Sequence, residues 1–173
     1  MKTWVILLRG INVGGHHIVP MKELRQLMED NGFKKVSTYI QSGNVVCQYP
    51  TKPKTEIGSL IEKQFGFNPS SFVLSAEELQ NIANNSPYPK EAGKAVHFFF
   101  FHKPPEIVDF QLLNSLKADT EYYQLLNNVF YLYAPDGIGR SALASKIDKA
   151  FGKAEMTARN LNTVNKLLDM VGN

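Results

Sequence analysis

A glycine-rich segment near the start of the chain has the composition of a loop that binds an anion. Three glycines stand within the six residues from Gly10 to Gly15, and Arg9 comes directly before them. Glycine allows positive φ angles, which turn backbone N–H groups toward a ligand. The spacing resembles a phosphate-binding loop, but His16 and His17 stand where such a loop needs a lysine and a hydroxyl residue. The segment therefore predicts either a structural turn or a loop for a polar or anionic ligand, and not an ordinary nucleotide-hydrolase loop.

The arginines of this chain are few and stand mostly in predicted loops. Arg9, Arg140 and Arg159 each lie beside a glycine or an asparagine and lead toward a predicted helix, whereas Arg25 lies on a helix face. A guanidinium group offers a planar fork of donors that suits carboxylate or phosphate. The free N–H groups at a helix N-terminus also favour an anion. These positions predict anion binding, with helix capping alone as the alternative.

The first half of the chain predicts the elements that would position this loop. Pro20 suits a helix start, Gly32 a helix stop, and Gly43-Asn44 a hairpin turn. Ser75 followed by Glu78 forms a capping box at the start of a connecting helix. The predicted strands are 4–8, 35–40, 45–49 and 71–74, with helices starting at Pro20 and around Ile57. This order is the βαββαβ unit of ferredoxin-like folds.

The second half predicts the same order with one difference. Strands are expected at 95–102, 121–126 and 129–134, with helices opening at Pro104-Pro105, spanning 141–151 and starting at Thr157. A helix thus takes the place of the fourth strand. The fold class is therefore α+β, with two tandem ferredoxin-like (βαββαβ-type) subdomains whose antiparallel sheets are covered by helices. We expect residues 1–84 and 94–173 to form the two subdomains and residues 85–93 to form the linker.

The predicted topology gathers polar residues at one edge of the first sheet. In a βαββαβ unit, the loop after the first strand and the hairpin between the second and third strands emerge on the same edge. We therefore expect the loop Arg9–Gly15 and the turn Gln41–Asn44 to be neighbours and to form one rim. Polar side chains gathered on loops suggest recognition. The alternative is that Asn12 and Asn44 only satisfy turn backbone.

A run of four phenylalanines, Phe98 to Phe101, marks a strand that is apolar on both faces. Ferredoxin-like sheets can stack RNA bases on exposed aromatic side chains. Burial on both faces explains the run more simply, because the basic and aromatic consensus of RNA-binding sheets is missing. We therefore predict a buried strand.

The remaining composition excludes several function classes. The chain has 173 residues, a net charge of +3 and one cysteine, Cys47, which rules out a disulfide framework and a cysteine-based zinc site. Residues 1–54 carry a net charge of +5, which could steer an anion. No metal site, cofactor or nucleophile with a visible base is predicted. No apolar run suits a membrane span or a signal peptide, so we expect a cytoplasmic protein without membrane contact.

Several blocks of the sequence resemble the bacterial family catalogued as domain of unknown function 1697. They are Leu8–Gly15, Val19–Met21, Thr38–Val46, Asp136–Ser141 and Thr157–Val164. The resemblance implies a two-subdomain α+β fold, a cytoplasmic bacterial protein and no established activity or catalytic residues. His16, Ile18 and Ala142 stand where this family often has lysine, and Leu161 where it often has tryptophan, which weakens a phosphate site in this member.

Together these observations predict a binding module for an anionic ligand, either a nucleotide, a phosphorylated metabolite or a nucleic acid. The candidate ligand-binding residues are Arg9, Gly10, Asn12, Gly14, Gly15, Gln41, Ser42, Asn44, Arg140, Arg159 and Asn160. One alternative is an enzyme acting on a small anionic substrate, with Arg9 or Arg159 as the anion clamp. Another is an interaction protein with no small-molecule site. The sequence makes no prediction of oligomeric state.

Overall fold

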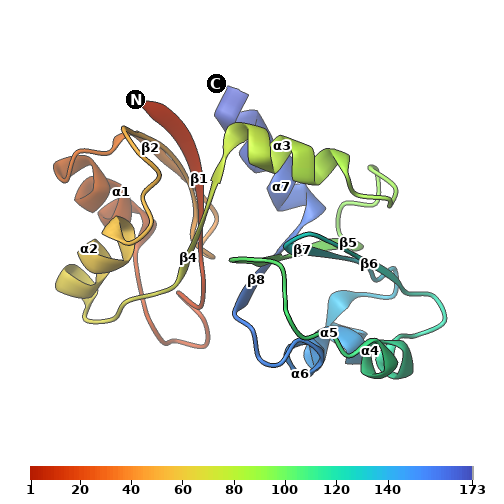
Figure 1. The fold of residues 1–173 in the computed structure, drawn as a ribbon. Coiled ribbons are helices and arrows are strands. Elements are labelled where there is room, and N and C mark those ends of the chain that lie inside the picture. The colour runs from red at the N-terminus through yellow and green to blue at the C-terminus, as the bar shows by residue number, and fades with distance from the viewer. Residues whose placement is uncertain (173) are drawn as a thin grey trace. The chain divides into compact units, whose positions relative to one another are not determined.

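The computed structural model describes residues 1–172, which fall into two units (Figure 1). The first unit comprises residues 1–84 and residues 165 onward, and the second comprises residues 85–164. The last helix, placed in the second half by the sequence analysis, therefore contributes its C-terminal part to the first unit. Each unit contains one four-stranded antiparallel sheet with helices, which confirms the predicted tandem ferredoxin-like fold.

The first unit has the strand order β2-β3-β1-β4. Its elements are β1 (Lys2–Leu8), α1 (Met21–Asp30), β2 (Lys34–Tyr39), β3 (Asn44–Tyr49), α2 (Glu56–Phe65), β4 (Ser71–Ser75) and α3 (Ala76–Asn84). Helices α1 and α2 cover one face of the sheet (Figure 1). Leu24 and Ile61 pack there against Ile6 and other alternate residues of β1, and all three side chains are fully buried. This apolar packing fixes the position of β1, and therefore of the loop that follows it.

The second unit repeats this strand order as β6-β7-β5-β8. Its elements are β5 (Val96–Phe101), α4 (Phe110–Leu116), β6 (Tyr122–Leu126), β7 (Val129–Tyr133), the 3₁₀ turn η1 (Ile138–Arg140), α5 (Ala142–Ser145), α6 (Ile147–Ala150) and β8 (Met156–Asn160). Helix α7 (Leu161–Gly172) follows β8 directly. Helices α4, α5 and α6 cover one face of this sheet (Figure 1), where Leu113 and Leu143 join the buried cluster around Phe99.

The predicted helix start at Thr157 is wrong, because residues 156–160 form the edge strand β8. This strand pairs with β5, with His97 opposite Asn160 and Phe101 opposite Met156. The helix begins at Leu161, and Asn160 caps it, because its Oδ1 accepts a hydrogen bond from the Thr163 backbone N–H at 2.9 Å. Thr157 and Asn160 both have side chains that favour a helix cap. Because residues 156–160 pair with β5, Thr157 stays in the strand and Asn160 becomes the cap. The second unit therefore completes the βαββαβ pattern.

Two other helix predictions in this unit need correction. Helix α4 begins at Phe110 rather than at Pro104, because Asp109 Oδ1 accepts from the Leu112 backbone N–H at 2.9 Å and caps the helix there. The predicted helix 141–151 is two short helices, α5 and α6, which meet at Lys146 with φ −119°. These changes lie away from β5, so the predicted sheet is unaffected by them.

The phenylalanine strand β5 is buried on both faces, as predicted. It lies between β7 and β8, and each residue from Phe98 to Phe101 is at most 6% exposed. Phe99 and Phe101 face the helices, whereas Phe98 and Phe100 face the opposite side of the sheet. None of these rings is accessible for stacking a base, so this strand gives no support to an RNA-binding surface.

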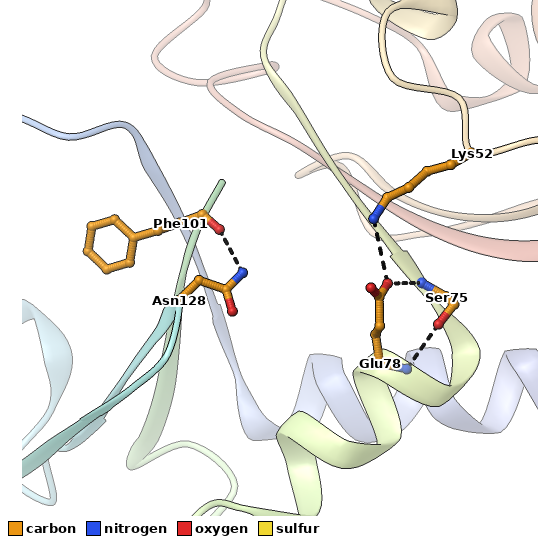
Figure 2. A network of polar contacts seen from close by, with 5 residues as sticks. All are labelled: Lys52, Ser75, Glu78, Phe101 and Asn128. Atoms are coloured by element: carbon orange, nitrogen blue, oxygen red, sulfur yellow. Dashed lines mark hydrogen bonds and ion pairs between the residues drawn. The ribbon is translucent and has the colours of Figure 1, made fainter. Parts of the chain in front are cut away.

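Side-chain hydrogen bonds fix one helix start and one hairpin turn (Figure 2). Ser75 Oγ accepts from the Glu78 N–H at 3.0 Å, and Glu78 Oε2 accepts from the Ser75 N–H at 2.7 Å, which is the predicted capping box. In the second unit, Asn128 Nδ2 donates to the carbonyl of Phe101 at 3.0 Å and ties the β6–β7 turn to the end of β5.

Among residues 1–172, no helix is both long and apolar enough to cross a bilayer.

Candidate functional site

The loop between β1 and α1 folds into a small hairpin of its own. The His16 N–H donates to the Val13 carbonyl, and the Asn12 N–H donates to the His17 carbonyl, both at 3.0 Å. Gly14 and Gly15 form the tip with φ angles of 58° and 76°. Positive φ at both central residues is the geometry of a type I′ turn, which glycine adopts without strain. The glycine-rich loop is therefore a defined turn that projects from the end of β1.

Asn12 acts as a clamp within this loop. Its Oδ1 accepts from the Val19 N–H at 2.8 Å, and its Nδ2 donates to the carbonyls of Val19 at 3.0 Å and Gln41 at 2.8 Å. The side-chain amide thereby ties both ends of the hairpin and the β2–β3 turn together. Its hydrogen-bonding capacity is largely used in this way, so Asn12 positions the loop.

The β2–β3 turn packs directly against the end of β1. The Leu8 N–H donates to the carbonyl of Gly43 at 2.8 Å. Asn44 is fully buried, and its Nδ2 donates to the Tyr39 carbonyl at 3.0 Å and to Ser42 Oγ at 2.9 Å. Asn44 therefore closes the turn from inside. The structure brings the predicted loop and turn together, and it gives Asn12 and Asn44 the backbone-satisfying role that the sequence left open.

A third loop, between α2 and β4, joins the same edge. The Arg9 N–H donates to the Ser70 carbonyl at 2.9 Å. The rings of His17 and Phe67 stack with their centroids 4.2 Å apart and 13° between their planes. His17 Nδ1 also lies 3.3 Å from the Gly10 carbonyl. This loop was not among the predicted site residues, because only the pairing of β4 with β1 brings it to this edge.

We call these three loops, residues 9–18, 40–43 and 66–70, the Arg9 edge. The side chains of Arg9, His16, His17 and Gln41 are exposed there. None of the three loops contains an aspartate or a glutamate. Eight of the eleven candidate residues lie at or next to this edge: Arg9, Gly10, Asn12, Gly14, Gly15, Gln41, Ser42 and Asn44. Arg9 is the single arginine or lysine of these three loops.

The other three candidate residues belong to the second unit. Arg140 is exposed at the end of η1, and Ser141 next to it caps α5 through its Oγ. Asn160 caps α7. Arg159 lies in β8, only 8% exposed, and its Nη1 donates to Thr157 Oγ1 and to the Ala158 carbonyl, both at 2.8 Å. Burial lowers the pKa of Arg159 to about 10. Arg159 is thus a buried strand residue and not a residue of a helix start.

The corresponding edge of the second unit holds a histidine–carboxylate pair. His102 follows β5 as Arg9 follows β1, and its Nε2 lies 2.8 Å from Oε1 of Glu155, which precedes β8. A pocket of about 270 Å³ opens beside the pair, with Ile107 and Phe151 among its apolar walls. A histidine bonded to a carboxylate is the arrangement of a general base when a substrate reaches it. Sequence reasoning missed the pair, because 53 residues separate its members.

Comparisons with known proteins give a family and a similar structure. A family model described as "Protein of unknown function (DUF1697)" matches residues 1–131. No curated protein matches the chain. The chain is similar to a solved structure described as that of the conserved bacterial protein SP0830 from Streptococcus pneumoniae, with 27% identity and a TM-score of 0.72. The alignment covers 98% of this chain and 98% of that chain.

Proposed function

The chain belongs to the DUF1697 family, whose description assigns no activity, and from its own geometry we propose that it is a binding module for an anionic ligand held at the Arg9 edge. The observation that carries this proposal is the clamped hairpin that follows β1. Five of its residues have positive φ angles: Gly10, Asn12, Gly14, Gly15 and His17. The Asn12 amide fixes their conformation, so the loop is ordered before a ligand arrives, and little binding energy is lost in ordering it.

The charge of the edge supports an anion as the ligand. Arg9 supplies a guanidinium group to the same loop that carries His16 and His17, and the three loops contain no carboxylate. Residues 1–54, which include two of these loops, carry a net charge of +5. A positive field of this kind raises the local concentration of an anion.

The stacked rings of His17 and Phe67 favour a ligand that carries a ring. The pair links the Arg9 loop, through the exposed His17, to the loop between α2 and β4, through Phe67. Bases and other planar rings stack on aromatic side chains. Among the predicted ligands, a nucleotide therefore fits the edge better than a phosphorylated metabolite without a ring.

The test is a titration of the full chain with adenosine triphosphate and with a short single-stranded oligonucleotide at three salt concentrations. Arg9→Gln should weaken binding by about 10- to 100-fold, because a charge-assisted hydrogen bond contributes about 1.5–3 kcal/mol. If an oligonucleotide is held through several phosphates, the logarithm of its association constant should fall with the logarithm of the salt concentration. The expected slope is about −0.7 for each phosphate contacted. A single nucleotide should show a shallower salt dependence.

Lys22→Gln is the matched control, because Lys22 is an exposed cation of the same unit on α1. It should leave binding unchanged, and neither variant should change the melting temperature by more than a degree or two. Equal loss of affinity in both variants would show that diffuse charge attracts the ligand. Loss of binding together with loss of folding would show that Arg9 has only a structural role.

A further inference from the structure

A second pocket, separate from the Arg9 edge, lies in the first unit. Its volume is about 340 Å³, and it is formed by β1, β2, β3 and the last turn of α7. Thr3 stands opposite Gln48 in the sheet, and Ser37 stands opposite Val46. By strand alternation these four residues lie on the face of the sheet away from α1 and α2, because Trp4 and Cys47 pack on the helix side. Met170 and Val171 of α7 are also in its wall.

Four polar side chains line this pocket without using their hydrogen-bonding groups inside the chain. They are Thr3, Lys35, Ser37 and Gln48, and within residues 1–172 none of them makes a side-chain hydrogen bond or an ion pair. Together they offer two hydroxyls, an amide and one ammonium group. The lining contains no carboxylate, so Lys35 is its single charged group. The second unit's pocket differs, since His102 and Glu155 there already bind each other.

The backbone at Lys35 is unusual for a strand residue. Its φ angle is 49°, and the register of β2 against β3 shifts between Lys34 and Ser37. A β-bulge of this kind breaks the alternation of side chains and re-aims one of them. Non-glycine residues with positive φ persist only where the surrounding structure enforces them, and they gather at functional sites. Here the bulge adds a cation to a pocket wall otherwise made of neutral groups.

We propose that this pocket binds a small organic monoanion with a short apolar body. Its carboxylate or phosphate group meets Lys35 and the hydroxyls of Thr3 and Ser37. Its apolar part packs against Val46 and Met170. The volume is at the small end of the range for ligand pockets, which restricts the ligand to metabolite size.

The experiment is a set of NMR titrations of the full, isotope-labelled chain with acetate, butyrate and inorganic phosphate. Butyrate should shift the amide signals of Thr3, Ser37 and Gln48 saturably and bind more tightly than acetate, because its longer chain reaches the apolar wall. Tighter binding of phosphate than of acetate would assign phosphate as the charged group, and the reverse would assign carboxylate. Lys35→Gln should weaken binding of the better anion by about tenfold or more.

Lys34→Gln is the matched control, because Lys34 is an exposed neighbour in the same strand and does not line the pocket. The Lys34→Gln variant should bind the better anion with the same affinity as the unchanged chain. Arg9→Gln should also bind butyrate normally, which separates this pocket from the proposed function of the Arg9 edge. The proposal is overturned if Lys34→Gln and Lys35→Gln lose affinity equally. It is also overturned if none of the three anions shifts these signals up to about 50 mM.

Discussion

Gly43 is a position where adding one methyl group should have a large effect on stability. It is buried in the β2–β3 turn with a φ angle of 86°. A Cβ atom there would lie 2.7 Å from Leu8 Cβ and 2.9 Å from Ile11 Cδ1. Both contacts are far inside van der Waals distance, and Leu8 Cβ is fixed to the backbone of β1. Gly43→Ala must therefore displace either the turn or the start of the glycine-rich loop.

Two separate costs make up the expected destabilisation. A left-handed backbone costs an L-residue about 1–2 kcal/mol. Overpacking of a well-filled interior costs about 1–3 kcal/mol more. Gly43→Ala should therefore lower the free energy of unfolding by about 2–5 kcal/mol. Gly66→Ala is the matched control, because Gly66 has the same φ angle of 86° and nothing within 4 Å of its added Cβ. The control should show the backbone cost alone.

Urea unfolding followed by tryptophan fluorescence measures both variants. Trp4 is the single tryptophan of the chain and is buried in β1, so it reports on the first unit. The midpoint should fall further for Gly43→Ala than for Gly66→Ala, with little change in the denaturant slope. Equal destabilisation of the two variants, within about 0.5 kcal/mol, would refute the steric argument. It would show that the turn moves away from Leu8 and Ile11 at no cost.

Three further predictions concern side chains described above. Asn12→Ala should lower the free energy of unfolding by about 2–3 kcal/mol, since it removes three hydrogen bonds. The rate of amide hydrogen exchange in residues 9–18 should rise in this variant. An unchanged exchange rate would show that Asn12 does not clamp the loop. Ser75→Ala should cost about 1 kcal/mol in thermal denaturation through loss of the α3 cap, whereas Ser59→Ala, on an exposed part of α2, should have no such effect. Burial raises the pKa of Cys47 and of Tyr131 to about 12, so the folded state keeps protons that the unfolded chain releases. The free energy of unfolding should therefore fall as the pH rises from 9 toward 12. Tyr131→Phe should make this fall shallower in urea midpoints measured across the same pH range.

The sequence predicted those parts of the fold that depend on neighbouring residues. The capping box at Ser75 and the turn at Gly43 are set by short stretches of chain, and both are present as predicted. Strand β8 was missed because its residues become a strand only by pairing with β5, about 60 residues earlier. Thr157 carries no local sign of that pairing and has the side chain of a helix cap.

The candidate site was predicted in part for a similar reason. Topology alone placed the loop after β1 beside the β2–β3 turn. Residue type did not show that Asn12 and Asn44 direct their amides to backbone groups, because the direction of a hydrogen bond depends on the folded loop. The pocket around Lys35 could not be predicted, since it depends on a β-bulge and on the last turn of α7. Neither feature leaves a pattern in the residues that form the pocket.

The division of the chain into units has a consequence for protein synthesis. The first unit includes residues 165 onward, so the ribosome makes the start and the end of this unit at different times. At 5–20 residues per second, about 4–16 s separate the synthesis of Asn84 from that of Asn165. Throughout that interval the nascent chain lacks Met170 and Val171, and one wall of the Lys35 pocket is absent. The pocket is therefore completed only once Met170 and Val171 have been made, and an N-terminal fragment that stops before them lacks this wall.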